Sequence, residues 1–206
     1  MRMPAADQHK VADLGKGWSH LRVPTGMRAG LPQGQRKGEP PPLAREGAGP
    51  HSAAMTPRLA TDPSLWPPIL SLLRDAFAYM EDRIDPPSSL RDLTEASLTR
   101  QAQTGAIWII GAPVACVFLT PRPKALYVGK LAVAAEHRGQ GLARRLMDQA
   151  AAQARQLGLP ALELQVRVEL VENQAAFQAM GFQEVGRTAH PGFDRPTSFT
   201  YRRAVD

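Results

Sequence analysis

The alternation of apolar and polar positions becomes regular only after about residue 55. From Ser64 onwards, apolar residues recur at spacings of three and four, which places them on one face of a helix. These residues are Leu65, Ile69, Leu72, Leu73, Ala76 and Phe77. The pattern predicts that this helix closes over residues 79–85, before the breaker Pro86-Pro87. Residues 90–100 are predicted to form a second, shorter helix.

Apolar runs between residues 107 and 133 predict three strands. The first two, at 107–110 and 114–119, are separated by Gly111-Ala112-Pro113 and read as a hairpin. The third covers 126–133, after a predicted break at Pro121-Arg122-Pro123. An amphipathic helix follows from Leu142 to Leu157, and Gly158 is a suitable residue to end it.

The C-terminal part continues with a strand at 162–168, where apolar and polar residues alternate. A short helix over 172–180 stops at Gly181-Phe182, and two last strands cover 183–188 and 198–202. The order α-α-β-β-β-α-β-α-β-β is typical of an α/β fold of the mixed, α+β-like kind. We therefore predict a central mixed β-sheet flanked by helices on both faces.

Residues 1–54 differ in composition from the rest of the chain. They hold seven of the nineteen prolines and eight of the seventeen glycines, and no apolar period persists in them. Such a segment buries too little apolar surface to offset its ordering entropy, so we predict that it is disordered. Met55 follows directly, so a mis-annotated N-terminal extension is one alternative and a functional tail is another. Residues 55–206 are predicted to form a single domain.

Charge and cysteine content narrow the function classes. The chain carries a net charge of +6, of which +4 belongs to residues 1–54; the predicted domain is nearly balanced at +2, which argues against a nucleic-acid-binding module. No apolar run is long enough to span a membrane, and no apolar core of a signal peptide is present. We expect a cytoplasmic protein, either a monomer or a homodimer. The single cysteine, Cys116, lies in an apolar run and reads as a small buried residue rather than a disulfide or metal ligand.

The turn His137-Arg138-Gly139-Gln140-Gly141-Leu142-Ala143 lies between a predicted buried strand and a predicted helix. The first N–H groups of a helix lack intrahelical partners and lie at the positive end of its dipole, so they can bind an anion. Residues with small side chains allow the anion to approach the backbone of the turn closely. Arg138 adds a charged hydrogen-bond donor to the anion, and Arg144 lies nearby. A purely structural turn is the alternative. A Walker A loop is excluded because no Lys-Ser/Thr follows, and the dinucleotide fingerprint lacks its third glycine.

This turn resembles the Arg/Gln-x-x-Gly-x-Gly/Ala signature of the GNAT N-acetyltransferase superfamily, since it follows Leu131-Ala132-Val133 and precedes a helix. A second block resembles the family's Asn…Tyr…Gly-Phe segment. It comprises the strand at 161–168, then Glu172-Asn173, Phe177 and Gly181-Phe182. The resemblance extends from about Met55 to the C-terminus.

The resemblance implies that the strand ending at Val133 and the strand beginning near Leu162 splay apart to form an acyl-CoA cleft. The cofactor-binding residues that it implies are Leu131, Ala132, Val133, Arg138, Gly139, Gln140, Gly141, Leu142, Ala143, Arg144, Asn173 and Phe177. The first three would pair with the pantetheine arm and the loop amides would hold the pyrophosphate. The co-substrate is then acetyl-CoA, without a metal, and a primary amine of a small molecule or protein attacks the thioester directly. A backbone N–H near Gly129, which also suits a β-bulge, would stabilise the oxyanion.

The chain departs from the family at Phe177, where a tyrosine often protonates the leaving thiolate. Tyr79, His190 and Tyr201 are the candidate replacements, although each also reads as an ordinary structural residue. Glu81, Asp82 and Asp85 are candidates for holding or deprotonating a cationic amine. Arg195 would favour a carboxylate-bearing acceptor if the segment from His190 to Ser198 forms one wall of the acceptor pocket. The resemblance therefore implies an acyl-CoA-dependent N-acyltransferase, and the alternative is a catalytically weak or inactive acyl-CoA-binding or sensor module.

Overall fold

The computed structural model describes residues 55–205, so the predictions for residues 1–54 lie outside the described part of the chain. The helices are α2 (Trp66–Phe77), α3 (Glu95–Thr104), α4 (Leu142–Gln156) and α5 (Val171–Ala179). The strands are β1 (Arg58–Leu59), β2 (Ala106–Ile110), β3 (Ala115–Arg122), β4 (Ala125–Val133), β5 (Ala161–Arg167), β6 (Gln183–Thr188) and β7 (Ser198–Ala204). The predicted order of helices and strands is confirmed, and the two-residue strand β1 is added to it.

The strands form one sheet in the order β1-β2-β3-β4-β5-β7-β6. Neighbouring strands are antiparallel except for β4 and β5, which run parallel and pair only at Leu126↔Leu162 and Tyr127↔Glu163. Beyond these pairs β5 is joined only to β7 among the strands of residues 55–205, so the sheet opens between the carboxyl ends of β4 and β5. The predicted mixed sheet is confirmed, and so is the splaying of its central strands.

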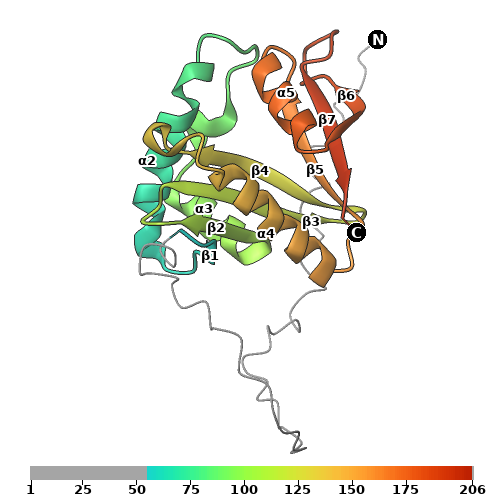
Figure 1. Ribbon diagram of the computed structural model, residues 1–206. Coiled ribbons are helices and arrows are strands. Elements are labelled where there is room, and N and C mark those ends of the chain that lie inside the picture. Colours follow the sequence, from blue (N-terminus) through green and yellow to red (C-terminus); the bar gives the residue numbers. More distant parts are fainter. Residues whose placement is uncertain (1–54, 206) are drawn as a thin grey trace, which may run out of the picture. The chain divides into compact units, whose positions relative to one another are not determined.

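Helices cover the two faces of the sheet (Figure 1). On one face, α4 buries Leu146, Met147 and Ala150 against inward residues of β3, β4 and β5, and α5 contributes Phe177 to the margin of the same core. On the other face, α2 and α3 pack Ile69 and Leu98 against β2 and β3. None of the helices within residues 55–205 is long and apolar enough to cross a membrane.

The second helix differs from its predicted range. Residues Ser89–Asp92 form a short 3-10 helix, Leu93 is extended, and α3 begins only at Glu95. Thr94 caps α3, because its hydroxyl accepts the Ser97 amide while the Ser97 hydroxyl accepts the Thr94 amide. This reciprocal cap fixes the start of the helix more strongly than the apolar spacing that suggested residue 90.

Pro121 does not end its strand, although the sequence predicted a break there. The strand β3 continues to Arg122 and pairs along β4, with Pro121 opposite Leu126. Proline lacks an N–H, but β2 begins at Ala106 opposite Leu119, so within residues 55–205 no strand pairs with β3 on that side at Pro121. The residue therefore occupies an edge position, where proline is tolerated.

The packing of α4 generates a stability prediction. Leu146 is fully buried in the core, so Leu146→Ala should lower the free energy of unfolding by about 2–5 kcal/mol through lost contacts and a residual cavity. Asp148→Ala, at an exposed position of the same helix, should change it by no more than about 0.5 kcal/mol. Denaturant unfolding of both variants measures the difference, and equal stabilities would contradict the burial of this helix face.

Candidate functional site

The turn between β4 and α4 contains two glycines with left-handed backbone conformations. Gly139 has φ of 75° and Gly141, the N-terminal cap of α4, has φ of 76°. Side chains are strained in this region, so the backbone itself favours glycine at both positions. A Cβ atom added to either residue would meet nothing within 4 Å, which means that the surface above the turn is open. The turn thus presents bare backbone to solvent.

The amides of this turn have no partners in the described part of the chain. From Gly139 to Arg144, no backbone N–H donates to a carbonyl or a side chain within residues 55–205. The first amide to close the helix is that of Arg145, which donates to the Gly141 carbonyl at 3.1 Å. Six adjacent donors therefore lie at the positive end of a fifteen-residue helix, an arrangement suited to a phosphate group.

Two side chains of the turn bind the loop itself. The Arg138 Nε donates to the Val133 carbonyl at 3.4 Å, and the Gln140 side-chain amide donates to the Glu136 carbonyl at 3.3 Å. Arg138, Gln140 and Arg144 are exposed. These contacts fix the path of the chain from the strand to the helix and leave the glycine amides uncovered.

The backbone of β4 faces the opening in the sheet at the residues that the sequence indicated. The Ala134 amide donates toward the β3 side, to the Val114 carbonyl at 2.9 Å. Because backbone groups alternate in direction along a strand, Leu131 and Val133 direct theirs toward β5. No strand pairs with them there within residues 55–205, so this edge of β4 can pair with an extended ligand.

A β-bulge lies in β4 one residue beyond Gly129. Cys116 pairs with Ala132 and Phe118 with Gly129, so two residues of β4 stand opposite one of β3. The extra residue is Lys130, which has a left-handed φ of 49°. The sequence predicted a bulge near Gly129, and the structure confirms it with the positive φ at the lysine instead.

Tyr79 and Asn173, which lie far apart in the sequence, meet in the structure. The Asn173 side-chain amide donates to the Tyr79 hydroxyl at 2.9 Å. Tyr79 follows α2 in a 3-10 turn and is 38% exposed, while Asn173 lies in the first turn of α5. Arg83 lies 5.5 Å above the Tyr79 ring and forms a 2.6 Å ion pair with Glu172. The structure therefore assembles an accessible phenol held between α2 and α5.

The other two candidate acids lie in different surroundings. Tyr201 is 1% exposed in the core between β5 and β6, and burial raises the pKa of its phenol. The backbone amide and the ring of His190 both contact the Thr197 hydroxyl, which holds the loop before β7. Phe177 packs edge-on against Phe182 with ring centroids 5.9 Å apart, as a hydrophobic residue would.

The sequence did not predict a set of hydrogen bonds and ion pairs that joins residues 83–86 to β5, α5 and their neighbouring loops. Arg167, the last residue of β5, is 9% exposed and donates to the Pro86 carbonyl at 2.9 Å. The Asp85 amide donates to Glu169 at 3.3 Å, and Arg195 approaches the Asp85 carboxylate at 3.4 Å. The alternation over 162–168 places Arg167 on the polar face of the strand, but alternation cannot show that a distant loop covers that face.

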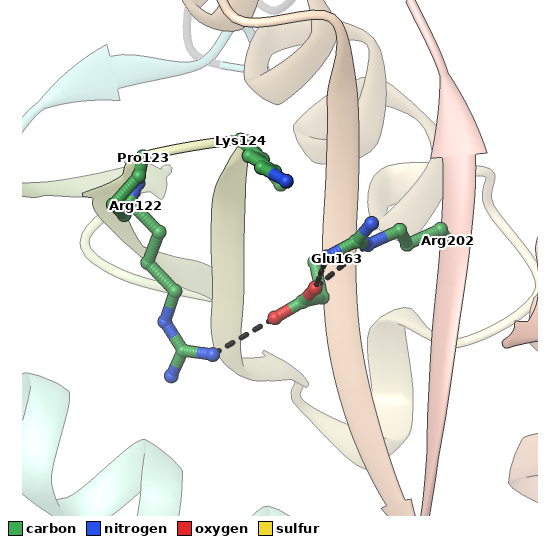
Figure 2. A pocket seen from close by; sticks show the side chains of 6 residues that line it. Arg122, Pro123, Lys124, Glu163 and Arg202 are labelled. Atoms are coloured by element: carbon green, nitrogen blue, oxygen red, sulfur yellow. Dashed lines mark hydrogen bonds and ion pairs between the residues drawn. The ribbon is translucent and has the colours of Figure 1, made fainter. Parts of the chain in front are cut away.

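A pocket of about 260 Å³ lies at the opposite end of β4 from the glycine turn (Figure 2). Its centre is Glu163, which is 8% exposed and accepts from Arg122 at 2.9 Å and from Arg202 at 2.7 Å. Arg122 also lies 3.7 Å above the Tyr127 ring. The carboxylate is fully paired and ties β3, β5 and β7 together, so we interpret this pocket as structural.

Comparison with known proteins identifies a family. Residues 66–182 match the model of the acetyltransferase (GNAT) family. This range includes the glycine turn, the opening between β4 and β5, and Asn173. No curated protein matches the chain.

Solved structures with the same fold have low sequence identity to this chain. An acetyltransferase of the GNAT family from Staphylococcus aureus is 12% identical with a TM-score of 0.58, covering 73% of this chain and all of that one. Ard1 from Thermoplasma volcanium is 20% identical with a TM-score of 0.56, covering 74% of this chain and 98% of that one. An acetyltransferase from Thermus thermophilus is 23% identical with a TM-score of 0.56, covering 73% and 98%. These similarities establish the fold.

Cys116 yields a prediction about chemical reactivity. Its side chain is fully buried, and burial raises the pKa of the thiol to about 12. The thiolate is the reactive form, so the folded protein should resist alkylation by iodoacetamide at about pH 8, whereas the denatured chain, with a thiol pKa near 8.5, should react readily. Mass spectrometry with and without guanidinium measures this contrast. Rapid alkylation of the folded protein would contradict a buried, structural role.

Proposed function

Because the chain belongs to the GNAT family of acetyltransferases, we propose that it transfers an acetyl group from acetyl-CoA to a primary amine by direct attack. The observation that carries this proposal is the row of amides from Gly139 to Arg144, at the start of α4, that have no partner within residues 55–205. A pyrophosphate placed there would meet donors already oriented toward it, without any reorganisation of the loop. The open backbone above both glycines gives the close approach that this contact needs.

The remainder of acetyl-CoA would continue from the turn into the opening of the sheet. The pantetheine amides would pair with the backbone of Leu131 and Val133, as an additional strand would. The thioester would then reach the bulge at Gly129 and Lys130, where a strand amide not used in the ladder can stabilise the oxyanion. The two faces of the opening differ, since α4 and α5 cover one and α2 covers the other. We infer that the acceptor amine enters from the α2 side.

Tyr79 is the residue that we propose as the proton donor to the leaving thiolate. Asn173 and Phe177 are four residues apart in α5 and so project from the same face of the helix, with Cβ atoms about 6 Å apart. The hydrogen bond from Asn173 thus brings the Tyr79 hydroxyl within about one helical turn of Phe177, the position where the family often has its tyrosine. Tyr201 is buried in the core and His190 is held by Thr197, so Tyr79 is the best placed of the three candidates.

The reaction then balances without a covalent enzyme intermediate. The amine nitrogen attacks the thioester carbonyl carbon and the C–N bond forms. The C–S bond breaks, and the departing thiolate takes the phenolic proton of Tyr79. The amine loses a proton to solvent, from which Tyr79 is reprotonated.

The first test is acetyl-CoA binding by the full-length Gly141→Glu variant. A carboxylate at this position should repel the pyrophosphate, and we expect affinity to fall by at least about 100-fold, since such a repulsion amounts to several kcal/mol near a protein surface. Isothermal titration calorimetry gives the dissociation constant, and circular dichroism verifies that the variant is folded.

Gly158→Glu is the matched control for that experiment. Gly158 lies at the other end of α4, has φ of 67° and also has open space around its Cβ position. The variant therefore carries the same added charge and a similar backbone strain, and it should bind acetyl-CoA as the parent does. Equal loss in both variants would remove the turn as the binding site, and a folded parent without affinity would refute the proposed function.

The second test is the Tyr79→Phe variant. Loss of the phenolic proton should lower kcat by about 100-fold while the dissociation constant of acetyl-CoA stays unchanged. Release of CoA thiol measures turnover on a panel of primary amines, and the buried Cys116 should contribute no background in the folded protein. Tyr127→Phe removes a phenol at the opposite end of β4 and should leave kcat unchanged. An unaltered kcat in Tyr79→Phe would exclude this acid, and acetyl-CoA binding without turnover on any amine would favour the binding or sensor module.

A further inference from the structure

The bulge in β4 determines which face of the sheet receives Lys130. Leu126 and Val128 point into the core beneath α4, so uninterrupted alternation would direct residue 130 into that apolar core as well. The extra residue shifts the alternation, and Leu131 and Val133 pack on the α4 side instead. Lys130 thereby lies on the α2 side, with its Nζ 5.8 Å from the centre of the Phe118 ring.

The backbone at this position is strained. Lys130 is the one residue other than glycine with a positive φ among residues 55–205. A left-handed conformation is unfavourable for an L-residue because its Cβ crowds the following carbonyl, and such strain is concentrated at functional sites. Gly129, directly before it, would adopt the conformation without cost, yet the lysine carries it.

The Lys130 ammonium group forms no ion pair with the residues that the structure describes. No carboxylate lies within ion-pair distance of its Nζ among residues 55–205. The titratable group facing it is Cys116 on β3, which remains a thiol. The half-buried position lowers the pKa of the lysine through desolvation, so a larger fraction is neutral than in water.

The choice of lysine is itself informative. Residues 55–205 contain fifteen arginines and only two lysines, Lys124 and Lys130. Arginine keeps its charge under all ordinary conditions, whereas a desolvated lysine can lose its proton and act as a nucleophile. Lys130 can therefore act as a nucleophile beside the bulge, which the arginines of this domain cannot do.

We propose that Lys130 is an internal acceptor, which takes an acetyl group from acetyl-CoA bound in the cleft of the same chain. This inference rests on the proposed function, since it requires the thioester to lie at the bulge. The neutral Nζ attacks the thioester carbonyl carbon, the C–N bond forms and the C–S bond breaks. The CoA thiolate leaves and is protonated, and the new amide nitrogen releases a proton to solvent. The Nζ lies over the Phe118 ring of β3, and the flexible four-carbon side chain allows it to turn from there toward an acetyl group held at the bulge.

Acetylation would change the acceptor side of the cleft. The product is a neutral, longer side chain on the α2 face, where the acceptor amine is proposed to enter. Turnover on an external amine should therefore decline as Lys130 becomes acetylated, so that the modification limits the enzyme when acetyl-CoA is abundant and acceptor is scarce.

The experiment incubates the full-length protein with acetyl-CoA and follows acetylation of individual peptides by mass spectrometry. Occupancy at Lys130 in the protein as purified is measured first and removed with a lysine deacetylase if present. Lys130 should then be acetylated at least about tenfold faster than the exposed Lys124, at a first-order rate independent of protein concentration, as expected for a group held beside the reagent. Lys124→Arg should leave this rate unchanged.

Gly141→Glu separates cleft-bound acetyl-CoA from acetyl-CoA in solution. In this variant the Lys130 rate should fall to that of Lys124. Equal rates at both lysines in the parent, or an unchanged Lys130 rate in Gly141→Glu, would assign the modification to solution chemistry and overturn the proposal. Acetyl-CoA that binds and leaves Lys130 unmodified would also overturn it while the proposed function stands. Absence of acetyl-CoA binding would instead refute the proposed function.

Discussion

The site depends on the incomplete pairing of two parallel strands. β4 and β5 are joined by only two residue pairs, at the ends where both strands begin. Two kinds of contact fix that joined end: the buried apolar residues Leu126 and Leu162, and the Glu163 carboxylate held by Arg122 and Arg202. Because this end is fixed, the other end can open without loss of the sheet, and β5 keeps its order by pairing with β7 along its whole length. The opening leaves an edge of β4 without a strand partner within residues 55–205, on the strand that leads into the turn before α4.

Sequence reasoning located the turn and its helix well, because the features that define them are local. Two glycines, the apolar stripe of α4 and the glycine that ends it all lie within twenty residues, and each has a direct backbone consequence. The start of α3 was misplaced because a capping pair outweighed the apolar spacing. The continuation of β3 through Pro121 was missed because it depends on where a neighbouring strand ends, which alternation within one strand does not show.

The proposed acceptor side, between the segment after α2 and α5, was predictable only in part, because it is formed by contacts between residues far apart in the sequence. Tyr79 and Asn173 could each be named from the sequence, but their hydrogen bond joins residues 94 positions apart. The burial of Arg167 beneath Pro86 likewise follows from the path of a loop 81 residues earlier. Phe177 has no hydroxyl group, but Tyr79, which follows α2, places one near the same face of α5 through its hydrogen bond with Asn173. The family signature covers the proposed cofactor side of the site, whereas the proposed acceptor side depends on how the segment after α2 lies against α5.

The bulge at Lys130 connects these two halves. One inserted residue moves Leu131 and Val133 onto the face beneath α4 while their backbone groups still face β5, so the strand can hold an extended cofactor. The same insertion turns a lysine toward α2 rather than into the core, where an unpaired ammonium would be strongly unfavourable. A regular strand of this composition would have to bury that charge or give up its apolar contacts with α4. The bulge therefore satisfies the packing on both faces of the strand, and the strain at Lys130 accompanies the separation of its proposed cofactor face from its proposed acceptor face.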